Sequence, residues 1–330
     1  MLRLLKMKYF SLVLFFCLSN AVFAQNESII DSLKLPIFID SLFLDHDLNN
    51  YSVRFYSNYK DNRFRVANAQ ENSTYAPRNP FGIGIGLATK KLIIDLGLNI
   101  KSPKNESTDR IDLQATLMFR NHLLDFTFQR YQGYNELNAS ASDFREDISV
   151  FSSRLNYMYM FNAEEQSITA MKSGLYHQKK FAYSFGLGGF FFINTISADS
   201  SLIPIESSAL YNEQAQITDF YGIGGGVLGG ISVTYPFSRN FFISSSVSSG
   251  IGLIYKEVET KTIFYIPSSP MLYQVNMSAI LGYSWDKSYI NITAAYGLLS
   301  TNLDFGNTVG YNIVNTKLVF GYKFGKNKDQ

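Results

Sequence analysis

The sequence has little cysteine, tryptophan or charge. Its 330 residues include one Cys and one Trp, and 17% are charged, whereas Tyr and Phe number 22 and 28. The single cysteine excludes a disulfide-stapled fold, and the aromatic content excludes a disordered chain. The formal net charge of +2 gives no reason to expect a nucleic-acid partner. The chain has 23 glycines but none before Gly82, so its composition changes near residue 80.

Residues 1–24 have the features of an export signal. Arg3, Lys6 and Lys8 precede a short apolar run, and small residues lie just before position 25. The run is shorter than the roughly 20 residues that a membrane-spanning helix needs, so we expect cleavage rather than anchoring. The segment also contains Cys17, so the exported chain would carry no cysteine.

Beyond this segment, apolar residues alternate with small or polar ones. From Tyr221 to Tyr235 the odd positions are mostly apolar and the even positions are mostly glycine. Phe241 to Tyr255 has the same alternation, with mainly serine and glycine at the even positions. At a tilt of about 45° each segment would rise on the order of 33 Å, enough to cross an apolar band about 25 Å tall. Long strands that are apolar on one face favour a closed membrane barrel, in which every backbone group is bonded. A soluble sandwich with unusually long strands is the alternative.

The same alternation, followed along the chain, predicts an all-β fold. We expect a transmembrane, antiparallel, up-and-down β-barrel of about twelve strands over 51–324, with ten or fourteen strands as alternatives. The segment 162–180 is interpreted as a turn. Residues 25–50 would form a periplasmic extension, a plug or a disordered segment, and 325–330 a short tail. Short turns are expected at 88–91, 120–122, 236–240 and 285–288, and long polar connections at 101–110, 134–147, 195–217, 256–269 and 299–309.

Several short motifs lie in the first half of the predicted barrel. They are Asn79-Pro80, Asp112-Leu113-Gln114, Asp125, Gln129-Arg130-Tyr131-Gln132-Gly133-Tyr134 and Gln178-Lys179-Lys180. Together they resemble an uncharacterised bacterial family, domain-of-unknown-function family 4421, over roughly residues 50–324. Phe181 and Tyr183 depart from the small residues expected after the last motif. The resemblance implies an outer-membrane location and no assigned activity.

Polar side chains at the strand positions between the outward apolar residues are candidates for lining the barrel lumen. Asp95, Asp112 and Asp125 fall on successive strands, whereas Arg54 and Lys317 fall on the first and last. Acid and base in separate sectors of the wall would set a transverse field across a narrow pore. Alternatively, these groups pair with one another and fill a small barrel. The candidates are Arg54, Asp95, Asp112, Gln114, Asp125, Gln129, Arg154, Asn156, Gln274, Asn276, Asn291 and Lys317.

The expected function is that of a passive small-solute channel or of a structural or surface protein. One alternative is a barrel-embedded lipid hydrolase, but His46, His122 and His177 have no evident serine and acid beside them. Another is a docking platform that uses 25–50 or the 195–217 loop. The expected partners are outer-membrane lipid, lipopolysaccharide and, during insertion, the barrel-assembly machinery. No cofactor, metal or nucleic acid is expected, and the location would be the outer membrane of a Gram-negative bacterium.

Overall fold

The structure is a computed structural model that describes residues 40–47, 49–100, 107–137 and 144–326. These residues fall within one compact unit, Phe38–Gln330. The predicted signal peptide, most of the 25–50 segment and the last four residues of the predicted tail lie outside the described residues. No helix in the described ranges is long and apolar enough to cross a bilayer.

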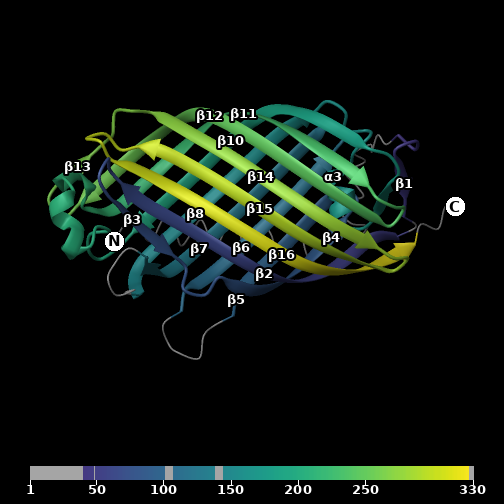
Figure 1. Cartoon of the computed structure of the whole chain (residues 1–330), viewed down its shortest axis with the longest axis horizontal. Coiled ribbons are helices and arrows are strands. Elements are labelled where there is room, and N and C mark those ends of the chain that lie inside the picture. Colours follow the sequence, from purple (N-terminus) through teal and green to yellow (C-terminus); the bar gives the residue numbers. More distant parts are fainter. Residues whose placement is uncertain (1–39, 48, 101–106, 138–143, 327–330) are drawn as a thin grey trace, which may run out of the picture. The chain divides into compact units, whose positions relative to one another are not determined.

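Twelve long strands form one antiparallel ring (Figure 1). They are β2 (Asn49–Ala67), β4 (Phe81–Thr89), β5 (Leu92–Asn99), β6 (Asp109–Phe119), β7 (His122–Glu136), β8 (Phe144–Met160), β10 (Ala182–Ser197), β11 (Ile217–Pro236), β12 (Phe241–Thr260), β14 (Met271–Ser284), β15 (Ser288–Asn302) and β16 (Thr308–Lys326). Each strand pairs with the next in the ring, and β16 pairs with β2 to close it. The predicted twelve-stranded up-and-down barrel is therefore confirmed, and the counts of ten and fourteen were wrong.

The two ends of the ring differ in their connections. At the terminal end, where β2 begins and β16 finishes, short turns join most strands, but β1 (Leu44–His46), α3 (Ile168–Lys172) and β9 (Tyr176–Gln178) also lie there (Figure 1). Longer connections occupy the opposite, loop end. They contain β3 (Asn72–Ala76), the 3-10 helices η1 (Ile205–Leu210) and η2 (Glu213–Ala215), and β13 (Phe264–Tyr265).

The alternation in the sequence places one face of each strand outside the ring and the other inside. In β4 the outward side chains of Phe81, Ile83 and Leu87 are 62%, 57% and 63% exposed. The inward glycines between them leave room for large neighbours. A Cβ at Gly84 would lie 2.1 Å from the ring carbon Cζ of Tyr56. The glycine-rich face therefore allows bulky side chains of adjacent strands to point inward.

Candidate functional site

Buried ion pairs join β2, β5 and β16 on the inner side of the ring. The Asp95 carboxylate on β5 contacts Arg54 Nε at 3.2 Å and Lys317 Nζ at 3.0 Å, and all three side chains are buried. Lys317 also donates to Gln114 on β6 at 2.8 Å. Because β4 separates β2 from β5 in the ring, the Arg54–Asp95 contact runs across the inner side. The expectation of acid and base in separate sectors was wrong, since closure of the ring brings them within bonding distance.

A second buried group surrounds Asp112. Lys60 Nζ lies 2.5 Å from its carboxylate, Arg110 Nε lies 3.8 Å away, and Tyr131 donates to it at 3.1 Å. Arg110 also donates to Asn58 Oδ1 at 2.9 Å. Lys60 and Arg110 are functional candidates that the sequence interpretation missed. Each is an even number of residues from a candidate on the same strand, Lys60 from Arg54 on β2 and Arg110 from Asp112 on β6. The alternation therefore predicted that both side chains face inward.

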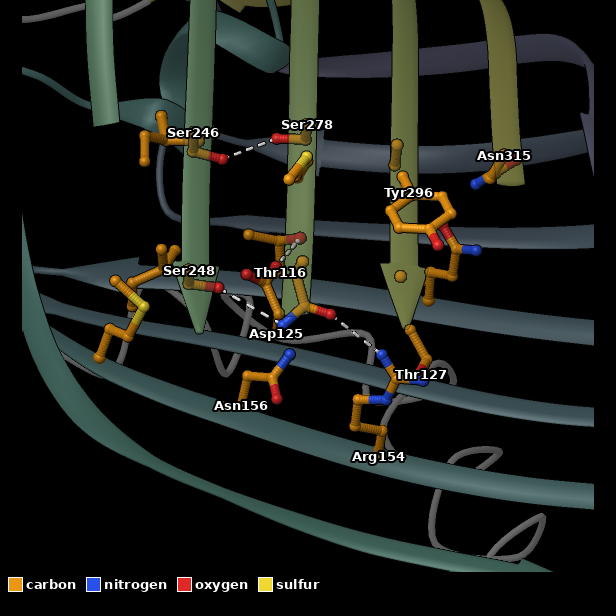
Figure 2. A pocket seen from close by; sticks show the side chains of 18 of the residues that line it. Thr116, Asp125, Thr127, Arg154, Asn156, Ser246, Ser248, Ser278, Tyr296 and Asn315 are labelled. Carbon is orange, nitrogen blue, oxygen red and sulfur yellow. Dashed lines mark hydrogen bonds between the residues drawn. The ribbon is translucent and has the colours of Figure 1, made fainter. Parts of the chain in front are cut away.

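Two side-chain hydrogen bonds connect β8 with β14, which are not adjacent in the ring. Arg154 on β8 donates to the Asn276 Oδ1 atom on β14 at 3.2 Å, and Gln274 donates to the Asn156 Oδ1 atom at 3.0 Å. Figure 2 shows the side chains of β12 and β14 facing those of β7 and β8. On a neighbouring part of the wall, Gln129 accepts hydrogen bonds from β2 and β8. Except for the bond from β8 to Gln129, which joins two adjacent strands, these contacts link strands that are separated in the ring.

All twelve predicted lumen residues thus lie on the inner side of the ring. Seven are buried, and five, Gln114, Asp125, Arg154, Asn156 and Asn276, are partly buried around a shared cavity. Asp125 accepts a hydrogen bond from Thr116 at 2.7 Å. Most of these groups contact one another, which is how polar groups fill a small barrel. A role in solute passage stays a prediction.

The segment interpreted as a turn, residues 162–180, instead forms a plug at the terminal end. The Lys172 carbonyl accepts a hydrogen bond from Asn291 on β15 at 2.8 Å and a longer one from Arg54 at 3.4 Å. Met171 packs with Phe242 and Ile280 from β12 and β14. Because these contacts reach separate parts of the wall, the plug spans the mouth of the ring.

Asp47, His177 and Lys323 form an ionic latch that links the segment after β1 to the plug and to β16. β1 pairs with β9, and Asp47, which follows β1, lies 2.6 Å from Lys323 Nζ and 3.7 Å from His177 Nε2. Burial alone would raise the pKa of the Asp47 carboxyl. Hydrogen bonds with His177, Lys323 and Asn49 outweigh burial and hold that pKa well below its ordinary value. Asp47 is therefore ionised at neutral pH and keeps the latch closed.

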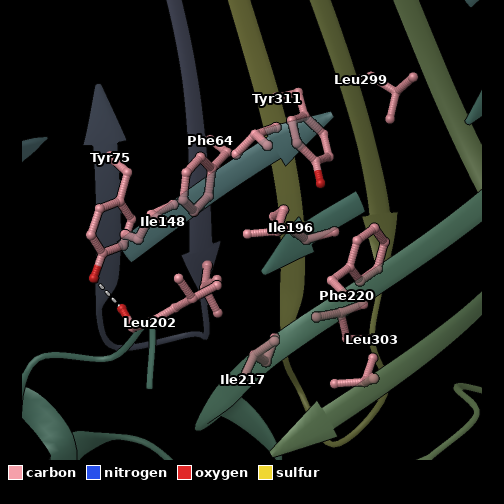
Figure 3. Packing of buried hydrophobic residues seen from close by; sticks show 14 of the residues in the cluster. Phe64, Tyr75, Ile148, Ile196, Leu202, Ile217, Phe220, Leu299, Leu303 and Tyr311 are labelled. Atoms are coloured by element: carbon pink, nitrogen blue, oxygen red, sulfur yellow. Dashed lines mark hydrogen bonds between the residues drawn. The ribbon is translucent and has the colours of Figure 1, made fainter. Parts of the chain in front are cut away.

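The loop end is filled by a hydrophobic cap. Residues 198–216, within the predicted long polar connection at 195–217, place Leu202, Ile203 and Ala215 inside the ring, almost fully buried. They pack against inward side chains of the strands, among which Figure 3 shows Phe64, Ile148, Ile196, Phe220, Leu299 and Tyr311. Tyr75 donates a hydrogen bond to the Leu202 carbonyl, which fixes the cap to β3. The expectation of a polar connection was wrong because Leu202, Ile203 and Ala215 turn into the lumen, although Ile205 and Leu210 stay exposed.

Between the plug and the cap lies a chamber of about 280 Å³. Hydroxyl and amide groups line much of it, and Ser246 and Ser278 are hydrogen-bonded to each other at 2.7 Å (Figure 2). Ile168 and Lys172 of the plug form part of its wall. The chamber is the candidate functional site, because it brings charged and polar side chains of several strands to one space.

The histidines form no hydrolytic arrangement in the described residues. His122 Nδ1 lies 2.9 Å from the Tyr157 hydroxyl, and His177 Nδ1 lies 3.0 Å from the Arg239 carbonyl. Neither has a serine hydroxyl among its hydrogen-bond partners, and His46 lies in β1 opposite Tyr176. In the part of the chain that the structure describes, no group of three His, Cys, Asp or Glu side chains could hold a metal ion.

Comparison with known protein families assigns this ring to a family. A family model described as "Domain of unknown function (DUF4421)" matches residues 38–324. The chain belongs to this family. The resemblance seen in the sequence is confirmed, and the DUF4421 match includes every strand of the ring except the last two residues of β16. No curated protein matches the chain.

Several solved structures are similar to this DUF4421 protein. The translocator domain of the autotransporter NalP from Neisseria meningitidis is 11% identical, with 85% of this chain and 90% of that chain covered and a TM-score of 0.43. The outer membrane protease OmpT from Escherichia coli is 7% identical, with coverages of 85% and 98% and a TM-score of 0.37. The toluene transporter TodX from P. putida is 6% identical, with coverages of 84% and 91% and a TM-score of 0.30.

Proposed function

We propose that the chain is an outer-membrane β-barrel that works with a closed lumen, as a structural or surface protein rather than as a passive channel. The closed lumen is the observation that supports this choice. A plug occupies the terminal end, a hydrophobic cap occupies the loop end, and buried ion pairs join side chains of the inner wall between them. Between a passive channel and a structural or surface protein, the closure favours the second.

The outer surface supports the membrane location. Exposed aromatic side chains surround the terminal end, among them Phe161, Phe181, Phe237 and Trp285. Further from the terminal end, aliphatic side chains such as Val227, which is 65% exposed, cover the outer surface of the ring. An apolar band between aromatic girdles is the pattern of outer-membrane barrels, whose short turns face the periplasm. On that rule the plug faces the periplasm and the cap faces the cell exterior.

Conductance in planar bilayers tests the closed state. We expect the folded, purified protein to insert without discrete openings, because a plug lies at one end of the lumen and a hydrophobic cap at the other. Heat-modifiable mobility on a gel checks, independently, that the sample is a folded barrel. Regular single-channel steps from the wild-type protein would contradict the proposal and restore the passive channel.

A further inference from the structure

Arg154 points into the chamber with no carboxylate partner. Its Nη1 atom donates to the neutral amide of Asn276 at 3.2 Å, and its buried Nε atom has no hydrogen-bond partner. None of the ion pairs of the described residues includes Arg154. A guanidinium held in a membrane barrel without a counter-charge is energetically unfavourable, and such a group points to a functional site.

The charges around the chamber are unbalanced in favour of cations. Lys172 reaches the chamber from the plug and has no acid within ion-pair distance among the described residues. Asp125 is the chamber's carboxylate and is held by Thr116. In the described part of the mid-lumen, six basic side chains face three acids. The bases are Arg54, Lys60, Arg110, Arg154, Lys172 and Lys317, and the acids are Asp95, Asp112 and Asp125.

The remaining wall supplies hydrogen bonds of both kinds. Ser248 and Ser278 offer hydroxyl groups from β12 and β14, and Asn156 and Asn315 offer amides from β8 and β16 (Figure 2). The buried Asn315 Oδ1 atom has no hydrogen-bond partner. A volume of about 280 Å³ lies just below the range of about 300–1,000 Å³ that is typical of small-molecule sites. The chamber therefore suits a small polar molecule that carries both hydroxyl groups and negative charge.

We propose that the chamber binds a small organic anion whose carboxylate or phosphate oxygens are held by Arg154 and Lys172. A guanidinium binds either group through two parallel hydrogen bonds, and the surrounding serines and amides would bind the hydroxyls of the ligand. Because Lys172 belongs to the plug, a bound anion attaches the plug to the wall at Arg154 and stabilises the closed state. This inference rests on the closed lumen proposed above.

Native mass spectrometry of protein extracted from membranes in mild detergent gives the first test. We expect the folded wild-type protein to carry an added mass of a few hundred daltons or less that is lost on unfolding. The Arg154→Gln variant should lack this mass. The matched control is Arg130→Gln, which removes an exposed arginine on the outer face of β7 and should keep it.

Refolding with defined probes gives the second test. Protein refolded from denaturant with citrate or with glycerol 3-phosphate should unfold several degrees higher than protein refolded without a probe. The two probes distinguish a carboxylate ligand from a phosphate ligand. Galactose, a neutral probe, should give no shift. Arg154→Gln should lower the affinity for the stabilising probe by about tenfold or more. Lys172→Gln should lower that affinity less, and Arg130→Gln should leave it unchanged.

Three results would overturn the inference. They are a wild-type protein without added mass and without a shift from either anion, a shift as large with galactose as with the anions, and an Arg154→Gln variant that keeps the anion effect. The first would show that the chamber holds water only. None of these results depends on conductance, so failure of the anion site and failure of the closed lumen are distinguishable.

Discussion

Asp95 is the residue on which the mid-lumen network depends most. Its carboxylate receives both Arg54 and Lys317, and no other carboxylate lies within ion-pair distance of either base in the described residues. Removing one member of a buried ion pair leaves the other charge without compensation, which costs more than the pair contributes. The network therefore fixes the register of β2, β5 and β16 across the point where the ring closes.

Replacing this carboxylate should strongly destabilise the barrel. We expect Asp95→Ala to lower the free energy of unfolding by about 3–5 kcal/mol, because two buried cations lose their counter-charge. The measurement is urea unfolding in lipid vesicles, followed by the fluorescence of the single tryptophan, Trp285. Glu146→Ala, at an exposed position, is the control and should change stability by less than about 0.5 kcal/mol. A loss below about 1 kcal/mol for Asp95→Ala would show that the network is not a stabilising feature.

At this scale the sequence predicts which side chains face inward but not which ones meet. The period of two placed Asp95 and Lys317 on the inner face. Their contact depends on ring closure and on the stagger between strands, and no local pattern encodes either of them. Lys60 and Arg110 were in phase and could have been found by following every strand to its end.

Among the elements, the plug depends on one backbone position after α3. Gly174 has a φ of +69°, a conformation that side-chain-bearing residues rarely adopt, and a Cβ there would lie 2.4 Å from the Tyr289 ring. Because glycine has no side chain, the backbone at Gly174 can turn sharply and still pack directly against Tyr289 of β15. The close approach of Gly174 to Tyr289 therefore positions the end of α3 at the mouth of the ring.

Gly174→Ala should therefore loosen the plug. We expect faster protease cleavage within 162–180, because the added methyl group meets Tyr289 and the backbone conformation is strained. The matched control is Gly306→Ala at the loop end, where φ is +78° and nothing lies within 4 Å of the added carbon. The control carries the same backbone strain without the collision, so its cleavage at the plug should stay at the wild-type rate. Equal cleavage of both variants and the wild type would mean that Gly174 does not hold the plug.

The strands were predictable as elements, whereas the plug and the cap were not. A long strand repeats its signal over many residues, as β11 and β12 do. The plug has a helix of five residues, and its apolar side chains find their partners on distant strands. The cap likewise has no regular period, so its buried residues cannot be distinguished from those of an exposed loop by sequence alone.

For the whole molecule, the membrane location predicts that the stability cost of an outward-facing arginine depends strongly on its depth in the bilayer. Val227 lies near the middle of β11 and is 65% exposed, and Phe237 lies in the turn that follows that strand and is 58% exposed. Val227→Arg should cost about 2–4 kcal/mol in vesicles, because the charge would enter the apolar centre of the bilayer. Phe237→Arg should cost about 0–1 kcal/mol at the interface. Equal costs at the two positions in an unfolding titration would argue against a spanning barrel.

The central claim, that the lumen is closed at both ends, is tested most directly by cysteine accessibility. A Cys17→Ser background contains no cysteine, so one engineered thiol can be followed at a time. Ser278→Cys places the thiol in the chamber, and Ser238→Cys places it in an exposed turn as the control. We expect a charged, membrane-impermeant maleimide to label the folded Ser238→Cys variant rapidly and the folded Ser278→Cys variant only after unfolding. Labelling of folded Ser278→Cys at the rate of the control would contradict the closed lumen.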